Sequence, residues 1–588
     1  MKVSFLNIIN SVCRAPVKLP VKLSCFFYLY VFSCYSVASP NLVLAGGALK
    51  TCASLSAKNC ESDHVFVNAK THALYEVNAE SLSRYRKNST EFGKFDEVLY
   101  SKLANIYSSL GGAQYKKNAL FDALNDAGFH NDDIRSLSDV SYFLLLDSLE
   151  VSQVDTKGER LKERVSLAHT KEKASVDVYN AFLQAAKDKH RKKRVERQVR
   201  VGVITASSRD PFEAVDFYTG VFSNPDIDVQ WIPLTPALQH AKFVSDMGGK
   251  GCENLPHFRA QFTLFDKARL YPERAEKQTA WCLDETLALD TLSNLDGLFF
   301  NGGDQSKTLA ALTTPTGEPS TFLTHLRALW KADAIVVGGT SAGTAVQAGG
   351  FANGRPIPML TSGDSEGVLS SGVFAVPPVS QRCEDGSGCE NHLLDNAVTL
   401  NPVGGLGLFR YGLLDTHFSE RDREVRLIAA TAQSQQQFGF GVDETTALLV
   451  EPETQANQLS FSVIGKGGVF IVDLSEGRIE ETRYKEKAKR IIAGSASFVP
   501  SGSKGTIREG VLNIDLVKQE NAIPRHANKK GSADGVWREQ AMPLCRNAEE
   551  TSWEHLGTTH VLKRSAQSVV QRHNYCGYAY VPFLVFEP

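Results

Sequence analysis

A serine between two glycines is the first feature of this chain that could do chemistry. Residues 339–343 read G-T-S-A-G, directly after the apolar run A-I-V-V-G at 334–338. Glycines at these positions allow a tight strand-to-helix turn that lifts the serine hydroxyl to the edge of a sheet. The N–H of Ala342 would then lie at a helix N-terminus and could donate to an oxyanion. Ser341 is therefore a candidate nucleophile, and the alternative is a glycine-rich turn with a satisfied serine.

A serine nucleophile needs a base, and the base needs an orienting acid. His417 follows the expected strand 411–415, and Asp443 and Glu444 follow another at 438–442. Because sites form at the carboxyl ends of parallel strands, we expect His417 at the same edge of the sheet as Ser341. The order Ser, His, acid differs from the order Ser, acid, His of α/β-hydrolases, which argues against a lipase or esterase of that class.

A glycine pair could complete the oxyanion site. The expected strand 295–300 runs into N-G-G-D-Q at 301–305. A glycine at the end of a strand lets the backbone approach a ligand closely, so the N–H of Gly303 would be a second oxyanion donor. The alternative is a tight turn capped by Asp304.

Three arginines follow His417 closely: Arg421, Arg423 and Arg426. Guanidinium groups bind carboxylates in a bidentate manner, so three of them beside a candidate base suggest an acidic substrate group. The alternative is a surface helix on which the interspersed acids neutralise them. Spacing alone does not favour either interpretation.

The elements that must position these residues alternate between strands and helices. Apolar runs predict strands at 41–48, 201–206, 227–233, 295–300, 334–337, 411–415, 438–442 and 447–450, and one or two more within 461–473. Helical spacing occurs at 211–222 and 321–331, and 239–283 is a polar excursion. Apolar strands separated by helices predict an α/β fold with a mainly parallel sheet covered by helices on both faces.

Two stretches lie outside this pattern. Residues 71–198 are rich in charged residues, Leu and Ala, and predict a helical insertion between a first strand region at 39–70 and the catalytic α/β domain at 199–475. The insertion ends in a basic run at 187–194, which predicts a solvated helix end, with a protease-sensitive linker or a polyanion patch as the alternative. Residues 476–588 form a C-terminal extension with no functional interpretation.

The N-terminus predicts export. A basic segment without acids precedes an apolar stretch at 23–37 and small residues at 36–38, which is typical of a signal peptide cleaved after residue 38. A single membrane anchor is the alternative, but about 15 apolar residues fall short of the roughly 20 that span a bilayer. We therefore expect a periplasmic or secreted protein with no stable membrane span.

The cysteines agree with an oxidising compartment. Of the 11 in the chain, eight lie beyond residue 38 and fall into close couples. The simplest pairing is Cys52 with Cys60, Cys252 with Cys282, Cys383 with Cys389, and Cys545 with Cys576. None has C-x-x-C spacing, so we expect no zinc site.

Composition excludes several classes of protein. The chain has 588 residues, is 42% hydrophobic and 22% charged, and carries a net charge of −2. These values exclude a largely disordered, collagen-like or coiled-coil chain and argue against a dedicated nucleic-acid binder. The mean hydropathy of −0.20 excludes a protein with many membrane spans.

The chain resembles the cyanophycinase and aspartyl dipeptidase family of serine peptidases, and cyanophycinase more closely. The resemblance rests on F-F-N-G-G-D-Q at 299–305, G-G-T-S-A-G at 338–343, L-L-D-T-H-F-S-E-R-D-R-E-V-R-L at 413–427 and G-F-G-V-D-E-T-T-A-L at 439–448. The runs L-V-L-A-G-G at 42–47, V-G-V-I-T-A at 201–206 and V-I-G-K-G-G-V-F-I-V-D at 463–473 also fit. It covers roughly 41–70 and 199–475.

The resemblance implies a fold like that of class I glutamine amidotransferases, a possible homodimer, and no metal or organic cofactor. It implies Ser341 as nucleophile, His417 as base, Glu444 as orienting acid, and Gly303 and Ala342 as oxyanion donors. Substrate-binding positions implied in the same way are Gln305, Asp415, Arg421, Arg423 and Arg426. The implied substrate is cyanophycin, a poly-aspartate chain with arginine amide-linked to its side chains, cleaved to β-Asp-Arg dipeptides.

Two positions depart from the family pattern. Thr416 stands where cyanophycinases usually have Gln, and Thr344 stands where Ala is usual. Substrate contacts and the packing under the nucleophile could therefore differ. Two other functions stay open: an exported hydrolase of acidic peptides with the same fold, and a non-catalytic binding protein on that scaffold.

Overall fold

The computed structural model describes residues 39–62, 64–110, 112–379, 393–455, 457–484, 487–518, 535–572 and 575–587. Contacts divide the chain into Met1–Ala38 and Ser39–Pro588, and the following concerns the second unit. The predicted signal peptide and the predicted pair Cys383–Cys389 lie outside the described residues. Among the described residues, no helix is both long and apolar enough to cross a membrane.

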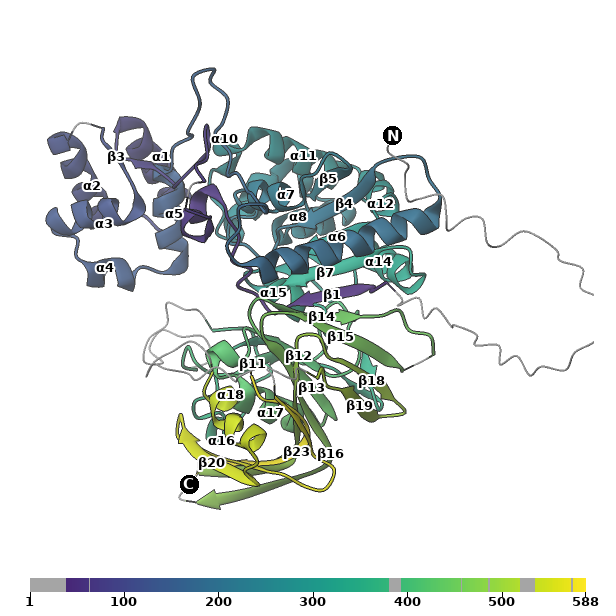
Figure 1. The fold of residues 1–588 in the computed structure, drawn as a ribbon. Coiled ribbons are helices and arrows are strands. Elements are labelled where there is room, and N and C mark those ends of the chain that lie inside the picture. Colours follow the sequence, from purple (N-terminus) through teal and green to yellow (C-terminus); the bar gives the residue numbers. More distant parts are fainter. Residues whose placement is uncertain are drawn as a thin grey trace, which may run out of the picture. The chain divides into compact units, whose positions relative to one another are not determined.

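The first sheet has nine strands within the described ranges (Figure 1). In spatial order they are β19 (Val511–Asp515), β18 (Lys504–Arg508), β15 (Leu459–Gly465), β14 (Thr446–Val450), β1 (Leu42–Ala45), β7 (Val336–Thr340), β6 (Gly297–Phe300), β4 (Val199–Ile204) and β5 (Ile227–Ile232). The five strands from β1 to β5 in this order are parallel, and the other four join antiparallel. The predicted α/β class is confirmed, with the parallel arrangement confined to one half of the sheet.

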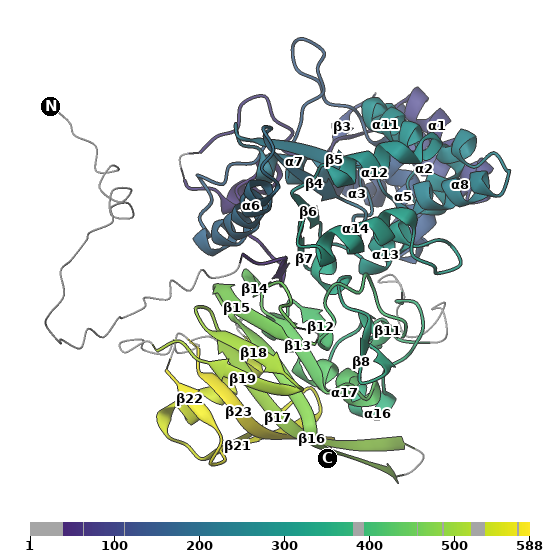
Figure 2. The same cartoon turned by 90° about the vertical axis from the view of Figure 1, so that its right-hand side faces the viewer.

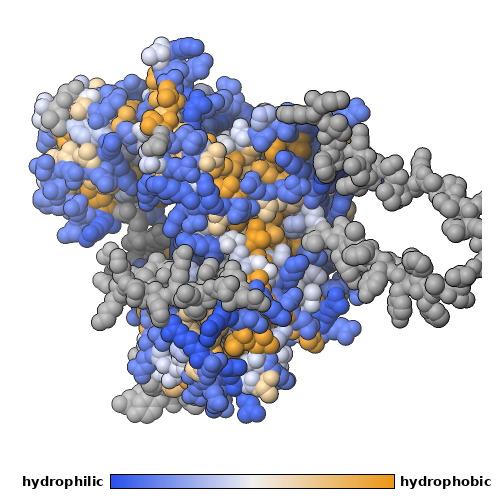
Figure 3. Space-filling view, in the orientation of Figure 1, coloured by the Kyte–Doolittle hydropathy of each residue, from blue (hydrophilic) through white to orange (hydrophobic). Residues whose placement is uncertain are grey.

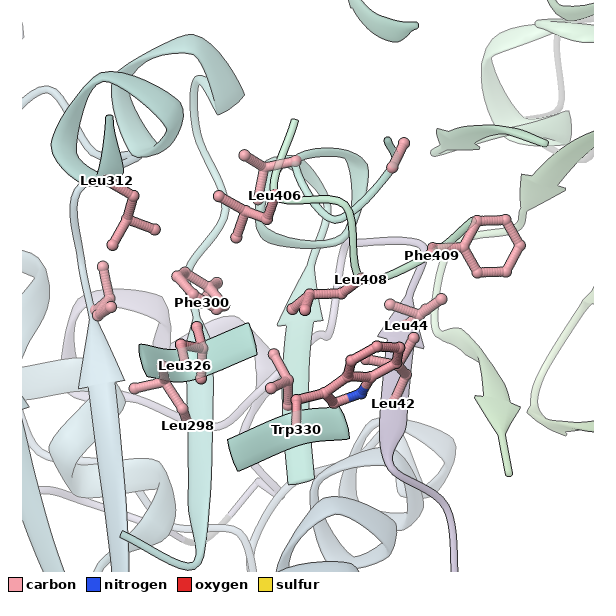
Figure 4. Packing of buried hydrophobic residues seen from close by; sticks show 14 of the residues in the cluster. Leu42, Leu44, Leu298, Phe300, Leu312, Leu326, Trp330, Leu406, Leu408 and Phe409 are labelled. Atoms are coloured by element: carbon pink, nitrogen blue, oxygen red, sulfur yellow. The ribbon is translucent and has the colours of Figure 1, made fainter. Parts of the chain in front are cut away.

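Helices cover both faces of the parallel half. On one face pack α6 (Lys173–Lys193) and α7 (Ala214–Phe222); on the other pack α8 (Pro236–Asp246), α11 (Pro272–Leu283), α12 (Glu285–Ser293), α13 (Gln305–Leu312) and α14 (Thr321–Lys331). Figure 4 shows Leu42 and Leu44 of β1 beside Trp330 of α14. Alternate β1 residues, such as Val43, face α6 instead, which explains why the strand is apolar throughout.

The segment 239–283, expected to be a polar excursion, is largely helical. It contains most of α8, then α9 (Leu255–Gln261), α10 (Lys267–Leu270) and α11. The prediction was wrong because the apolar residues of these helices are few, yet Leu238, Leu255 and Trp281 are buried against the sheet.

A second sheet of eight strands continues the chain (Figure 2). Its order is β12 (Leu413–Thr416), β13 (Phe438–Val442), β16 (Gly468–Tyr484), β17 (Lys487–Pro500), β23 (Gly577–Phe586), β21 (Thr558–Lys563) and β20 (Glu550–His555), with β22 (Val569–Gln571) paired to β23. One face packs against α16 (Val368–Ser371), α17 (Glu424–Gln433) and α18 (Val536–Ala541). The sequence did not predict this sheet, and five of its eight strands come from the C-terminal extension.

The predicted insertion divides into two parts. Residues 75–150, the helical region, contain β2 (Tyr75–Glu76), α1 (Ala79–Glu91), α2 (Glu97–Leu110), β3 (Gln114–Tyr115), α3 (Lys117–Asp126), α4 (Asn131–Ser136) and α5 (Asp139–Leu149). Hydrophilic side chains predominate on the face of these helices seen in Figure 3. The later helix α6 instead packs on the first sheet. Its basic end is paired, since Lys189 and Lys192 contact Asp333.

The remaining elements are short. They are η3 (Ser54–Asn59), η4 (Cys252–Asn254), α15 (Ala342–Ala345), β8 (Phe351–Ala352), β9 (Arg355–Pro356), β10 (Met359–Ser362), β11 (Thr399–Asn401), η6 (Ser419–Arg421) and η7 (Met542–Arg546). Three of the predicted disulfides are confirmed: Cys52–Cys60, Cys252–Cys282 and Cys545–Cys576.

Candidate active site

Ser341 occupies a strained turn between β7 and α15. Its φ of +54° lies in a region that non-glycine residues rarely adopt. The turn is tight, because a Cβ on Gly343 would lie 2.2 Å from the carbonyl oxygen of Phe300. The hydroxyl of Thr344 lies 2.7 Å from the carbonyl oxygen of Ala45, so the unusual threonine under the nucleophile ties this turn to the end of β1.

His417 reaches Ser341 from the other sheet. Its Nε2 lies 2.7 Å from Ser341 Oγ. The expectation that both residues share one sheet edge was wrong, since β12 belongs to the second sheet and β7 to the first. They meet because the backbone N–H of His417 donates to the Gly46 carbonyl oxygen, just after the end of β1, at 2.7 Å. Gly47 must be glycine, because a Cβ there would lie 2.4 Å from His417 Nε2.

Glu444 lies on the far side of the imidazole. Its Oε1 is 2.7 Å from His417 Nδ1. The residue sits where the chain passes from β13 of the second sheet to β14 of the first. The structure therefore brings Ser341, His417 and Glu444 together in one hydrogen-bonded chain. Asp443, the other acid suggested by the sequence, points away from His417 and is fully buried.

Burial and two nearby arginines favour the neutral form of the His417 imidazole. Burial lowers the pKa of His417 below 6.5, Glu444 opposes this shift, and Arg421 and Arg423 add to it. The hydrogen bond from His417 lowers the pKa of Glu444, so this carboxyl is ionised near neutral pH. A neutral imidazole beside an ionised carboxylate can accept a proton from a serine hydroxyl.

Two backbone N–H groups are available beside Ser341. Among the described residues, no acceptor receives a hydrogen bond from the N–H of Ala342 or of Gly303. The neighbouring Gly302 adjoins Ser341, and its own N–H donates to the hydroxyl of Tyr218. The Asp304 side chain caps α13, so this turn is both a helix cap and a wall of the site.

A cavity of about 450 Å³ opens at Ser341. Its lining includes every sequence-predicted site residue except the two candidate acids, Asp443 and Glu444, together with residues from β10 and the segment that follows it. The Gln305 side-chain amide donates to the carbonyl oxygens of Leu360 and Thr361, which leaves its oxygen as an acceptor for a ligand. Arg421 is exposed and, among the described residues, makes no ion pair, so its guanidinium can bind an anionic group.

The other two arginines are engaged within the protein. Arg426 forms a two-pronged ion pair with Asp415, and both side chains are buried. Arg423 donates to the carbonyl oxygen of Thr416 at 2.7 Å. Burial opposes ionisation of Asp415, but Arg426 and Arg423 outweigh it and lower the pKa of Asp415. Asp415 and Arg426 therefore form a neutral pair in the cavity wall, which differs from the exposed charge of Arg421.

Sequence reasoning missed residues that hold this site. Gly46 and Gly47 seat His417, and the apolar run ending in two glycines was their signal. Glu420 accepts a hydrogen bond from the Glu444 N–H, and Arg538 of the C-terminal extension contacts Glu420. Among the described residues, no group of three or more His, Cys, Asp or Glu is arranged to hold a metal ion.

Comparison with known proteins points in one direction. The chain is 31% identical over 186 residues to the cyanophycinase of Synechococcus elongatus, covering 32% of this chain and 44% of that protein. It is 26% identical over 239 residues to the cyanophycinase of Geminocystis herdmanii, covering 40% and 65% respectively. For that of Trichormus variabilis the identity is 29% over 187 residues, covering 32% and 48%. The chain resembles cyanophycinases. The predicted resemblance is thus confirmed, although the chain matches only about half the length of these cyanophycinases.

Two further comparisons add little. No protein-family model matches the chain. A crystal structure of a peptidase from an acI-B1 Actinobacterium aligns with 51% of this chain and 84% of that one, at 13% identity. Its TM-score of 0.27 is too low to bear on the cyanophycinase-like site.

Proposed function

We propose that this protein is an exported serine peptidase that hydrolyses cyanophycin to β-Asp-Arg dipeptides. The observation that carries the proposal is the hydrogen-bonded chain from Ser341 through His417 to Glu444, at 2.7 Å for each contact. Similarity to cyanophycinases supports the choice of substrate. Export is supported by three disulfides in the described residues and by the basic and apolar segments at the N-terminus.

In the proposed mechanism, His417 Nε2 takes the proton of Ser341 as Oγ attacks the amide carbonyl carbon. Glu444 stabilises the resulting imidazolium, and the N–H groups of Gly303 and Ala342 bind the oxyanion. His417 then gives the proton to the leaving amine. Water, activated by the same imidazole, releases the acyl group and restores Ser341.

The charges of the cavity suit a substrate that carries both signs. The exposed Arg421 guanidinium would attract an aspartyl or terminal carboxylate. The carboxylates of Asp364 and Asp395 line the same cavity and would attract guanidinium groups of the polymer. A polymer of arginyl-aspartate units presents both groups at each repeat.

The direct test is Ser341→Ala assayed on purified cyanophycin. We expect kcat to fall on the order of 10⁴–10⁶-fold, with β-Asp-Arg, identified by mass, as the product of the parent protein. The exposed Ser293→Ala serves as the control and should keep full activity, because it lies at the end of α12 and outside the cavity. Full activity in Ser341→Ala would refute serine catalysis at this site.

A second substrate class follows from Thr416. This residue lines the cavity and is shorter than the Gln usual in cyanophycinases, which leaves room for a different acyl or leaving group. A panel of acidic peptides assayed beside cyanophycin distinguishes the two. Cleavage of the peptides alone would keep the triad and replace the substrate. Labelling of Ser341 by a fluorophosphonate separates either enzyme from a non-catalytic binding protein, which would not react.

A further inference from the structure

The C-terminal extension docks on the loop that carries His417. Helix α18 begins at Val536, whose N–H donates to Asp422 Oδ1 at 2.7 Å. Asp422 directly follows η6, the short turn after His417. A segment more than one hundred residues away in sequence therefore lies against the turn that follows the candidate base.

Arg538 of α18 joins two carboxylates beneath the site. Its Nη1 lies 2.7 Å from Asp443 Oδ2, and its Nη2 lies 2.9 Å from Glu420 Oε1. The side chain of Arg538 is 3% exposed and that of Asp443 is fully buried. Hydrogen bonds between ionised groups are strong in such surroundings, and a guanidinium holds its two partners in a fixed geometry.

Each carboxylate in turn holds one of the catalytic loops. The other oxygen of Glu420 accepts from the Glu444 N–H at 2.9 Å. Asp443 directly precedes Glu444, and its Oδ1 accepts from the N–H of Ser419 at 3.1 Å. The loop of the acid and the loop of the base are thus linked to each other through the two carboxylates and to α18 through the guanidinium.

Burial and the proximity of two carboxylates disfavour the ionised form of Glu420, and Arg538 offsets part of this cost. Burial and the neighbouring Asp443 raise the pKa of Glu420 to about 7, and Arg538 opposes this shift. Without the guanidinium, the two carboxylates would repel each other at the point where the loops must stay together.

We propose that Arg538 is a positioning residue for the His417–Glu444 pair, acting through Glu420 and Asp443. The inference rests on the proposed function only in taking these two residues as the activating pair of Ser341. It requires no particular substrate. The C-terminal extension then supplies a residue that the active site needs for its geometry.

The test measures how fast a small fluorophosphonate labels Ser341, since this rate reports activation of the serine without any substrate. We expect Arg538→Met to slow labelling by roughly 10–100-fold, because a displacement of about 1 Å can cost about 10²-fold. Arg538→Lys keeps the charge but not the fork, so we expect an intermediate rate. Glu420→Gln should also slow labelling, because Arg538 and the Glu444 N–H each use a different oxygen of Glu420, and the NH2 group of Gln would face one of these two donors.

The matched control is Arg197→Met. Arg197 makes a similar fork to Asp296, which is fully buried at the start of β6, the end of that strand away from the site. Loss of the Arg197 side chain should change the labelling rate less than twofold, which is well under the roughly 1.4 kcal/mol that corresponds to a tenfold change. Folding of each variant is followed by circular dichroism, and if Arg538→Met does not fold, Arg538→Lys and Glu420→Gln decide. Folded Arg538 and Glu420 variants that label at the parent rate would overturn the inference. An inactive parent on cyanophycin with normal labelling would overturn the substrate alone.

Discussion

Two regions outside the cyanophycinase-like motifs are built into the protein in opposite ways. The helical region, residues 75–150, has a core of its own, formed by residues such as Tyr85, Leu103 and Leu144. The C-terminal region, residues 535–587, has no separate core, because its apolar residues pack in the core of the second sheet. The helical region is therefore attached to the α/β body as a separate unit, whereas the C-terminal region is part of the second sheet and its core.

The attachment of the helical region is narrow. The chain enters and leaves it at adjoining points, since Tyr75 and Glu150 form a β-bridge. Beside this bridge, Lys267 of the α/β body contacts three carboxylates: Asp147 at 3.0 Å, Glu150 at 2.5 Å and Asp210 at 2.9 Å. All four side chains are buried. Ion pairs and a few apolar contacts therefore fix the helical region in place.

The C-terminal region is joined by backbone pairing. Strand β23 runs antiparallel to β17, with Ile491 opposite Phe586 and Ala496 opposite Val581. Strand β21 then pairs with the other side of β23. This pairing means that the sheet which carries His417 depends on the last strand of the chain. We infer that activity tolerates loss of the helical region and does not tolerate loss of the C-terminal region.

The largest expected effect comes from deleting residues 519–588. This deletion removes β20 to β23 from one end of the second sheet, leaves β17 as an unpaired edge, and leaves Asp443 and Glu420 without Arg538, so we expect no cooperatively folded product and no labelling of Ser341. Circular dichroism and fluorophosphonate labelling measure the two outcomes.

The variant to compare with this deletion lacks most of the helical region: residues 77–146 are replaced with a short Gly-Ser linker. The β-bridge and the carboxylates of Asp147 and Glu150 remain in this variant, so we expect it to fold and to label Ser341 at a rate near that of the parent. Retained labelling after the C-terminal deletion, or lost labelling after this excision, would reverse the assignment of the two regions.

Local sequence predicted those parts of the fold in which a candidate site residue directly follows an apolar strand in the chain. The runs that form β1, β6 and β7 are largely apolar and are followed within a few residues by a pair of glycines or by Ser341, so their strands and their edge could be recognised. Ser341, His417 and Glu444 were nominated by short motifs and lie within hydrogen-bond distance of one another.

The second sheet could not be predicted in this way. Its strands pair over long separations, as β17 does with β23, and the sequence carries no local mark of register. This is why His417 was expected on the first sheet. Arg538 was missed because its partner Asp443 is far away in the chain. Asp443 is buried and does not contact His417, so its charge needs a cationic partner. Only the structure identifies that partner as Arg538.

The second-largest expected effect concerns Lys267 and its three carboxylate partners, which hold the helical region on the α/β body. We expect Lys267→Met to lower the free energy of unfolding by about 3–5 kcal/mol, because it leaves three buried carboxylates without this partner. Denaturant unfolding measures the loss, and Ser341 labelling in the absence of denaturant should stay near the parent rate. Lys242→Met is the control: its partners Asp246 and Glu285 are both accessible to solvent, so the loss should be below about 1 kcal/mol. Slow labelling in a folded Lys267→Met protein would mean that the helical region does influence the site.

The smallest effect on the site comes from the disulfides, which offer a pair matched in loop length. Cys545–Cys576 closes a separation of 31 residues in the C-terminal region, and Cys252–Cys282 closes 30 residues in the α/β body. Replacing either pair by alanines should lower stability by a similar amount, about 3–4 kcal/mol on chain entropy. Only the Cys545–Cys576 variant should also slow labelling of Ser341, by about two- to fivefold, because η7 follows α18 directly and the Tyr575 ring, next to Cys576, contacts the Arg538 guanidinium. Equal labelling in the two variants would show that α18 is held by its own contacts, and would confine the coupling between the C-terminal region and the site to the guanidinium fork itself.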